Sequence, residues 1–272
     1  MPNKTLVFIP CYNCEKQIPR VIKKLEDSAS HFFSEILILD NNSTDNTIES
    51  AKNALQKTKN LNACIAINDD NYGLGGSHKA AFSYALNNDF DHVVILHGDD
   101  QGDINDAIEL FESGEYKKHD ACLGSRFMKG SKTLGYSKFR IFGNYVFNMM
   151  FSIGTFNKVE DLGSGLNIVS KTVFKNPAIQ HYSDDLRFNI YLLLGLFREK
   201  QNIMFFPISW SEDDQISNVK LFSQARRTIT LLLESIFMRR GFATKDHRDK
   251  PVNQYTFKVL HSQSKTDQQA SN

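Results

Sequence analysis

The sequence predicts a layered α/β domain with a mostly parallel central sheet. Short apolar runs that are typical of buried strands alternate with segments whose apolar residues recur at helical spacing. Polar or acidic residues come directly after three of the first four strand-like runs. In open α/β sheets the ligand-binding edge lies at the carboxyl ends of the strands, so we expect the functional site there.

The first half of the chain alternates most regularly. The expected strands are 5–9, 35–39, 64–67 and 93–96. The expected helices are 15–28, 45–58 and an Ala-rich segment that ends near residue 87. The second helix follows turn and N-cap residues at 41–45, and Asp103 is expected to cap a further helix after the fourth strand.

The second half is less regular. Further strands are expected at 121–124, 166–169 and 203–206. Ser183, followed by Asp184 and Asp185, is expected to cap a helix that ends near residue 199, and a basic amphipathic helix is expected at 219–240. We therefore divide the chain into a main domain of residues 1–218, a C-terminal amphipathic helix and extension of 219–261, and a disordered tail of 262–272.

Composition excludes several classes of protein. The 272 residues are 41% apolar, and 32 Lys and Arg oppose 31 Asp and Glu, so the formal net charge is +1. A chain with this balance has no overall positive electrostatic field that would attract nucleic acid, and we expect no nucleic-acid partner. The four cysteines are too few for a disulfide scaffold, and the Cys-x-x-Cys pair at Cys11 and Cys14 lacks a second pair or a histidine pair at zinc spacing.

The cysteines and the start of the chain predict a location. Sparse, reduced thiols indicate the cytoplasm. The first residues lack the apolar stretch of a signal peptide, and no run of about 18 consecutive apolar residues is present. We expect a cytoplasmic protein that is at most peripheral on the inner face of a membrane.

The acidic cluster after the fourth strand is a candidate metal site. Asp99 and Asp100 are adjacent carboxylates that repel one another unless a cation or strong donors compensate. Mg²⁺ or Mn²⁺ shared with substrate phosphates is the usual solution. The alternative is a solvated turn, and for Asp103 we prefer a capping role.

Five motifs follow the first five expected strands in order, and a sixth comes before the strand expected at 166–169. They read PCYN at 10–13, DNNSTDNT at 40–47, NYG at 71–73, GDDQ at 98–101, GSR at 124–126 and DLGSG at 161–165. In order and spacing the first four resemble the nucleotide-sugar-binding half of glycosyltransferase family 2. The last two resemble the subgroup of dolichyl-phosphate mannose synthase and related polyprenyl-phosphate sugar transferases. The resemblance covers about residues 5–220, and DNNSTDNT is its most specific string.

The resemblance implies a GT-A fold, a Rossmann-like catalytic domain with a mostly parallel sheet. It implies an inverting transferase that moves a hexose from a nucleotide-diphosphate sugar, with Mg²⁺ or Mn²⁺, to a polyprenyl phosphate or to a lipid-linked or surface-glycan acceptor. Donor binding is assigned to Pro10, Tyr12, Asn13, Asp40, Asn71, Gly73 and Gly98. Metal binding is assigned to Asp99, Asp100 and His97, and catalysis to Asp99, Arg126, Asp184 and Asp185.

Each assignment has a structural alternative. Asp40 could shape an Asx-turn. Asp184 and Asp185 could act as a general base towards a hydroxyl acceptor, or they could only be acids that the helix dipole stabilises in the first turn of a helix. Arg126 could stabilise the leaving diphosphate or form a surface ion pair. His97 stands where the family commonly has the first acid of Asp-x-Asp, so it could bind the metal, bind phosphate or only end a strand.

The sequence also departs from the family on the acceptor side. At residues 165–167 the polyprenyl-phosphate subgroup often has an aromatic residue and then arginine, which this chain lacks. The uncharged, aromatic-rich segment 141–156 and the helix at 219–240 are candidates for peripheral membrane contact, for core packing or for a homodimer seam. The missing first acid leaves a second function open, a catalytically silent nucleotide-sugar-binding or scaffolding protein.

Two other nucleotide-binding classes fit less well. A dinucleotide fingerprint would need a third glycine at the position of His78. Its glycine motif would also have to follow the first strand. A nucleotidyltransferase would need a Gly-rich basic loop after the first strand, which residues 11–16 do not supply.

Overall fold

The computed structural model describes residues 3–212, 221–237, 242 and 245–264. The strands are β1 (Thr5–Cys11), β2 (Glu35–Asp40), β3 (Ala63–Asn68), β4 (His92–Leu96), β5 (Ala121–Ser125), β6 (Lys132–Leu134), β7 (Leu166–Ser170), β8 (Ile203–Pro207), β9 (Ser209–Ser211) and β10 (Phe257–Gln263). The α-helices are α1 (Ile18–Ser28), α2 (Thr47–Leu55), α3 (Gly73–Asn87), α4 (Ile108–Ser113), α5 (Lys138–Thr155), α6 (Lys171–Phe174), α7 (Phe188–Arg198) and α8 (Leu221–Phe237). Short 3₁₀ helices occur at Ile104–Ala107, Glu115–Lys118 and Pro177–His181.

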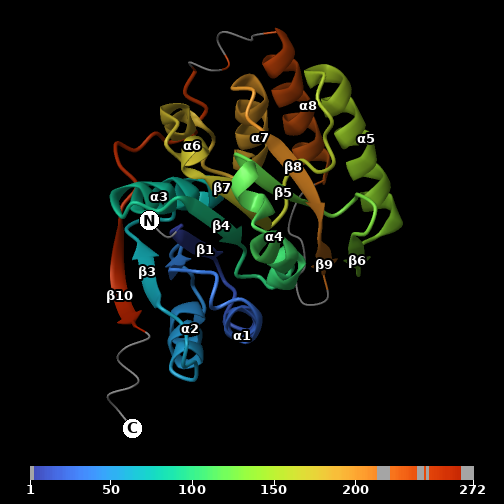
Figure 1. Ribbon diagram of the computed structural model, residues 1–272. Coiled ribbons are helices and arrows are strands. Elements are labelled where there is room, and N and C mark those ends of the chain that lie inside the picture. The colour runs from blue at the N-terminus through green and yellow to red at the C-terminus, as the bar shows by residue number, and fades with distance from the viewer. Residues whose placement is uncertain (1–2, 213–220, 238–241, 243–244, 265–272) are drawn as a thin grey trace.

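A central sheet runs through the molecule with helices on both faces (Figure 1). Within the described residues it has eight strands in the order β10-β3-β2-β1-β4-β7-β5-β8. The pairs β3–β2, β2–β1, β1–β4 and β5–β8 are parallel, whereas β7 and β10 run antiparallel to their neighbours. The expected α/β class with a mostly parallel sheet is confirmed.

The strand order reverses at β1. From β1 the chain adds β2 and β3 on one side, and then crosses to place β4 on the other side. Cys11 at the end of β1 lies in register with Asp40 at the end of β2. Such a reversal opens a crevice at the carboxyl ends of the strands, where ligands bind in this class of fold.

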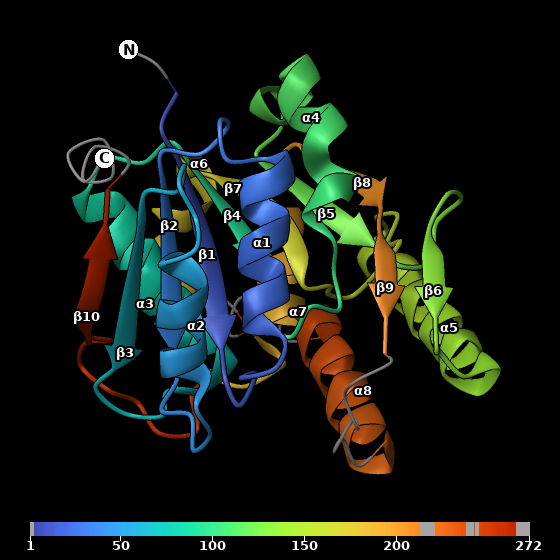
Figure 2. The same ribbon diagram turned by 90° about the horizontal axis from the view of Figure 1, so that it is seen from below.

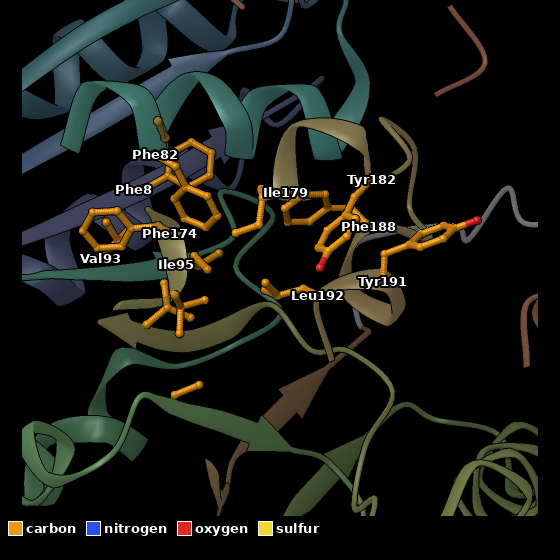
Figure 3. Packing of buried hydrophobic residues seen from close by; sticks show 14 of the residues in the cluster. Phe8, Phe82, Val93, Ile95, Phe174, Ile179, Tyr182, Phe188, Tyr191 and Leu192 are labelled. Atoms are coloured by element: carbon orange, nitrogen blue, oxygen red, sulfur yellow. The ribbon is translucent and has the colours of Figure 1, made fainter. Parts of the chain in front are cut away.

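Two apolar clusters hold the layers together, one on each face of the sheet. Leu6 and Phe8 point to the face covered by α3, α6 and α7, whereas Val7 and Ile9 point to the face covered by α1 and α2 (Figure 2). All four side chains are fully buried. Figure 3 shows the first cluster, in which aromatic rings from β1, α3 and α7 pack together. Helices on both faces explain why these strands read as continuous apolar runs.

Helix α5 lies at the periphery of the molecule, beside α8. Asn148 and Phe151 are buried, ten further residues of the helix are partly exposed, and six are exposed. Residues 141–156 therefore do not form a core helix. Among the described helices, none combines the length and the apolar content needed to cross a bilayer.

The structure changes two expected boundaries. Helix α7 begins at Phe188, so Ser183 is not its N-cap. Strand β10 was not expected, and it includes Ser262 and Gln263 of the predicted tail. The C-terminal extension thus contributes an edge strand to the same sheet as the main domain, while 265–272 and Arg239 and Arg240 of the predicted basic helix lie outside the described residues.

Candidate active site

The ends of β1 and β4 meet at the reversal point of the sheet. The backbone N–H of Gly98 donates to the carbonyl of Pro10 at 3.1 Å. A Cβ on Gly98 would lie 2.7 Å from the Cys11 sulfur and 3.2 Å from the Cys14 sulfur, so only glycine allows this approach. Both thiols are free and buried, and the neighbouring Cys14 together with burial raises the pKa of Cys11 well above its ordinary value. The two thiols of the Cys-x-x-Cys pair pack against Gly98 at the base of the site.

Asp40 closes β2 as an Asx-turn. Its carboxylate accepts from the Ser43 backbone N–H at 2.8 Å and from the Ser43 hydroxyl at 2.5 Å. The side chain is almost fully buried, and burial raises the pKa of Asp40 although the Ser43 donors oppose the shift. Asp40 thus forms the Asx-turn that was its structural alternative. Its contact with a donor base or ribose stays a prediction.

The loop after β1 is joined to the loop after β2. Asn13 takes a left-handed backbone conformation (φ +52°), which asparagine tolerates better than most residues. Its side-chain oxygen accepts from the Thr44 N–H at 2.8 Å, and its own N–H donates to the Ser43 hydroxyl at 2.9 Å. Tyr12, one residue earlier, leaves 52% of its surface exposed at this edge.

An amide network connects the ends of β2 and β3. Asn41 donates to the Asn71 side-chain oxygen at 2.8 Å, and its own side-chain oxygen accepts from the Asn68 amide and the Tyr72 N–H. Asn71 also accepts from the N–H of Gly73 at 3.1 Å. Sequence reasoning missed Asn41, although an amide directly after a strand-end aspartate is the signal that could have found it.

Asp99 and His97 come directly after β4, and their roles as metal ligands stay predictions. Asp99 accepts one backbone hydrogen bond, from Gln101 at 3.2 Å, and stays partly exposed. The His97 N–H donates to the carbonyl of Gly165, and its ring Nε2 is buried and has no partner among the described residues. Burial lowers the pKa of His97 although Asp99 opposes the shift, so the ring is neutral and Nε2 can serve as an acceptor or a ligand. Within the described part of the chain, no group of three or more His, Cys, Asp or Glu side chains could hold a metal by itself.

Asp100 does not share this environment. It takes a left-handed backbone conformation (φ +59°), and its carboxylate binds Arg20 at 2.6 Å and Lys24 at 2.9 Å, both on α1. Two side-chain cations already pair with this carboxylate, and a metal role for Asp100 stays a prediction. The sequence could not show this because it does not reveal which face of α1 meets the loop.

Arg126 forms a buried ion pair instead of a surface pair or an open anion site. Its Nε and Nη2 each bind Asp161 at 2.8 Å, and Nη2 also donates to the Gly163 carbonyl at 2.9 Å. Asp161 leaves 1% of its side chain exposed. Burial lowers the pKa of Arg126, but the Asp161 carboxylate outweighs it and holds the pKa above its usual range. The rings of Tyr136 and Trp210 flank the guanidinium. Arg126 therefore orients the 161–163 loop, and sequence reasoning missed Asp161 as its partner.

The adjacent acids after Ser183 have different partners. Asp185 accepts from Ser183 and from the backbone and side chain of Arg187, all within 2.9 Å. Burial raises the pKa of Asp185, but the Arg187 bonds prevail and lower it. Asp184 instead binds Lys79 of α3 at 2.6 Å and Tyr255 at 2.7 Å, two residues that sequence reasoning missed.

The expected donor residues form one continuous edge. Besides the Gly98–Pro10 bond, the N–H of Asn41 donates to the Cys11 carbonyl at 2.9 Å. The glycine-rich segment after Asn71 is not a dinucleotide fingerprint, because His78 is fully buried in the core and burial lowers the pKa of His78 to about 3. The structure thus brings the ends of β1, β2, β3 and β4 together, with Asp184 beside them.

Comparison with known proteins gives the family. The sequence model of Glycosyl transferase family 2 matches residues 6–182. The chain is 26% identical over 133 residues to an undecaprenyl-phosphate mannosyltransferase of Micrococcus luteus, which covers 49% of this chain and 52% of that protein. The chain matches about half the length of the curated relatives.

Solved structures show the same fold. Glucosyl-3-phosphoglycerate synthase of Mycobacterium tuberculosis, in complex with UDP, superposes with a TM-score of 0.58 at 15% identity, covering 90% of this chain and 81% of that one. S. aureus TarS 1–349, in complex with UDP-GlcNAc, superposes with a TM-score of 0.53 at 17% identity, covering 86% and 67%. The architecture is that of the GT-A glycosyltransferases, and the chain belongs to glycosyl transferase family 2.

Proposed function

We propose that this protein is an inverting glycosyltransferase that moves a hexose from a nucleotide-diphosphate sugar to a lipid-linked acceptor. The observation that carries the proposal is the convergence of Asp40, Asn71, Gly98 and Asp99 at the reversal point of a family 2 sheet. Two solved neighbours hold UDP or UDP-GlcNAc, which supports a nucleotide-sugar donor here.

A divalent cation, Mg²⁺ or Mn²⁺, belongs to this proposal. Asp99 would hold it by a carboxylate oxygen, and His97 Nε2 is the second candidate because this buried atom has no partner among the described residues. One or two protein ligands suffice when diphosphate oxygens complete the coordination shell. The glucosyl-3-phosphoglycerate synthase is also described in complex with Mn²⁺ and UDP, which supports this assignment. When bound, the cation offsets the charge that develops on the leaving diphosphate.

The remaining residues would bind and orient the substrates. Pro10, Tyr12 and Asn13 would border the nucleoside, and Asp40 would accept from the base or ribose. Asp184 would act as the base that takes the proton from a hydroxyl acceptor, since its loop contacts the first turn of α3 beside the donor edge. In one displacement the acceptor oxygen bonds to the anomeric carbon, the bond to the diphosphate breaks, and configuration inverts.

Calorimetry with a panel of nucleotide-sugars separates this function from that of a silent binding protein. With Mn²⁺ present we expect micromolar binding of one donor class, and slow release of free sugar when no acceptor is added. Without the cation, binding should weaken at least tenfold. Tight binding with no sugar release under any condition would favour a catalytically silent, scaffolding role.

An apolar stripe on α5 supports an acceptor at a membrane surface. Six large apolar side chains lie along one side of the helix and just past its end, between 51% and 86% exposed. They are Phe139, Phe142, Tyr145, Met149, Ile153 and Phe156. On α8, Ile229, Leu233 and Phe237 add exposed apolar surface at a spacing of four residues. A soluble monomer rarely exposes so much contiguous apolar area.

The charges around the α5 stripe favour an anionic lipid surface over a second protein copy. Residues 126–158 include six Lys or Arg and no Asp or Glu. The side chains of Lys129, Lys132 and Lys138 are exposed, as are Arg226 and Arg227 of α8. Basic residues flanking an apolar helix face are typical of interfacial helices. We therefore include peripheral contact with the inner face of a membrane, through 141–156 and 219–240, in the proposal.

Vesicle flotation tests the membrane contact. The protein should float with vesicles of 30% anionic lipid, and Phe142→Ser with Ile153→Ser should reduce binding at least tenfold, because each apolar side chain contributes about 1.5–3 kcal/mol of burial. Val259→Ser on β10, on the opposite side of the molecule, is the matched control and should bind normally. Failure to float, combined with elution as a dimer that the α5 variant converts to monomer, would assign the stripe to a homodimer seam.

A further inference from the structure

A fully buried lysine lies beside the candidate base. Lys79 is on α3, and its ammonium donates to the Tyr182 carbonyl at 2.5 Å, to Asp184 Oδ1 at 2.6 Å and to the Tyr255 hydroxyl at 3.3 Å. Burial lowers the pKa of Lys79, and the Asp184 carboxylate opposes that shift. A buried ammonium stays charged only where acceptors replace its water, and these three oxygens do so for Lys79.

Asp184 is held from two directions that are far apart in the chain. Its Oδ1 accepts from Lys79 on α3 and from Tyr255 in the segment before β10. Its backbone carbonyl accepts from the N–H of Gly75 at 2.7 Å, and a Cβ on Gly75 would lie 2.2 Å from the carbonyl of Ser183. Helix α3 and the loop that bears Asp184 are therefore in direct contact, and the carboxylate has a fixed orientation.

This contact places Asp184 next to the donor edge. Gly75 lies in the first turn of α3, two residues after Gly73, whose N–H binds Asn71. The Asp184 side chain is 20% exposed, so the carboxylate is held but remains accessible.

The C-terminal segment is anchored where it delivers Tyr255. The Tyr255 ring meets the Tyr72 ring edge-on at a centroid distance of 5.3 Å. The next residue, Thr256, binds Asp69 through both its hydroxyl and its carbonyl, and β10 then pairs with β3. Burial raises the pKa of Tyr255, so its hydroxyl stays protonated and donates to Asp184.

We propose that Lys79 and Tyr255 are positioning residues for Asp184, and that the segment leading into β10 is part of the catalytic unit. The inference rests on the proposed function and deepens it, because a held carboxylate base serves a hydroxyl acceptor and not a phosphate. As the acceptor oxygen bonds to the anomeric carbon, its proton passes to Asp184, and the electron pair of the breaking bond leaves with the nucleotide diphosphate. Lys79 and Tyr255 fix the orientation of the carboxylate through their hydrogen bonds to Oδ1.

Within the described part of the chain, two pairs of charged residues lie near this cluster. Asp246 and Arg248 approach from the C-terminal segment, and Asp185 and Arg187 from the loop and the start of α7. Neither pair binds Asp184 Oδ1, so removing the Tyr255 hydroxyl takes away one of its two donors and leaves the surrounding charges in place.

Tyr255→Phe is the test, because it removes one hydroxyl and keeps the ring packed on Tyr72. We expect kcat to fall about tenfold with the donor KM unchanged, as for a lost hydrogen bond to a charged group. The matched control is Tyr84→Phe on α3, the helix that bears Lys79; its hydroxyl binds Glu35, and the change should leave kcat and the donor KM unchanged.

Two outcomes would overturn the inference. An unchanged kcat in Tyr255→Phe, with donor binding intact by calorimetry, would reduce the cluster to a structural clamp while the proposed function stands. Full transfer by Asp184→Asn to the preferred acceptor would show that no base is needed. Loss of donor binding in the unmodified protein would instead refute the proposed function. Lys79→Met is the companion variant, and where it folds it should lower kcat with the donor KM unchanged, as Tyr255→Phe does.

Discussion

Replacing Asp99 by asparagine should abolish sugar transfer, lowering kcat by roughly 10²–10³-fold, because the carboxylate proposed to hold the cation is lost. The side chain keeps its size and partial exposure, so the fold should persist. Donor affinity should also stop responding to Mn²⁺. Steady-state transfer and calorimetry with and without the cation measure the two effects.

The matched control for Asp99→Asn is Asp103→Asn. Asp103 accepts from the Asn105 N–H at 3.0 Å and caps the short helix Ile104–Ala107, four residues beyond the site. An asparagine caps nearly as well, so activity should remain close to that of the original protein. Full activity in Asp99→Asn would contradict the metal-assisted mechanism, and equal losses in both variants would indicate general damage to the loop.

Breaking the buried ion pair between Arg126 and Asp161 should have the largest effect on stability. Asp161→Asn leaves the guanidinium buried without its counter-charge, and we expect the free energy of unfolding to fall by about 3–5 kcal/mol. Urea denaturation monitored by circular dichroism measures the change. The exposed pair of Lys171 and Asp89 is the control, and Lys171→Gln should alter stability by about 0.5 kcal/mol or less.

A double variant separates the contribution of the ion pair to stability from its contribution to sugar transfer. Arg126→Met with Asp161→Leu removes both charges and retains apolar volume, so it should recover much of the lost stability. Recovery of stability without recovery of transfer would mean that Arg126 orients the site through the 161–163 loop. If Asp161→Asn lowers the free energy of unfolding by less than about 1 kcal/mol, water already solvates the pair.

The fold was predictable where the signal is local. The first four strands are apolar runs that end at Pro10, Asp40 or a turn, and each lies within two residues of its expected position. Because carboxyl ends of parallel strands meet at one edge, the proximity of Asp40 and Asn71 also followed from the sequence. Strand β10 was missed because an edge strand is mostly exposed, so its residues show neither an apolar run nor a clean alternation.

The partners of the charged side chains were not predictable. Arg126 and Asp161 are 35 residues apart, and Lys79 and Asp184 are 105 apart. Their pairing depends on how β5 and α3 pack against loops from the second half of the chain. Residue identity marks such groups as candidates, but only the tertiary contacts decide which carboxylate is neutralised, as at Asp100, and which stays available, as at Asp99.

The pairing of β10 with β3 also has a consequence for biosynthesis. Thr256 is separated from its partner Asp69 by 187 residues. At translation rates of about 5–20 residues per second, β3 leaves the ribosome about 10–40 s before the strand that covers it. During that time the nascent chain exposes an apolar sheet edge that can pair with another chain. Ala63–Asn68 therefore lacks its β10 partner until the C-terminal segment emerges.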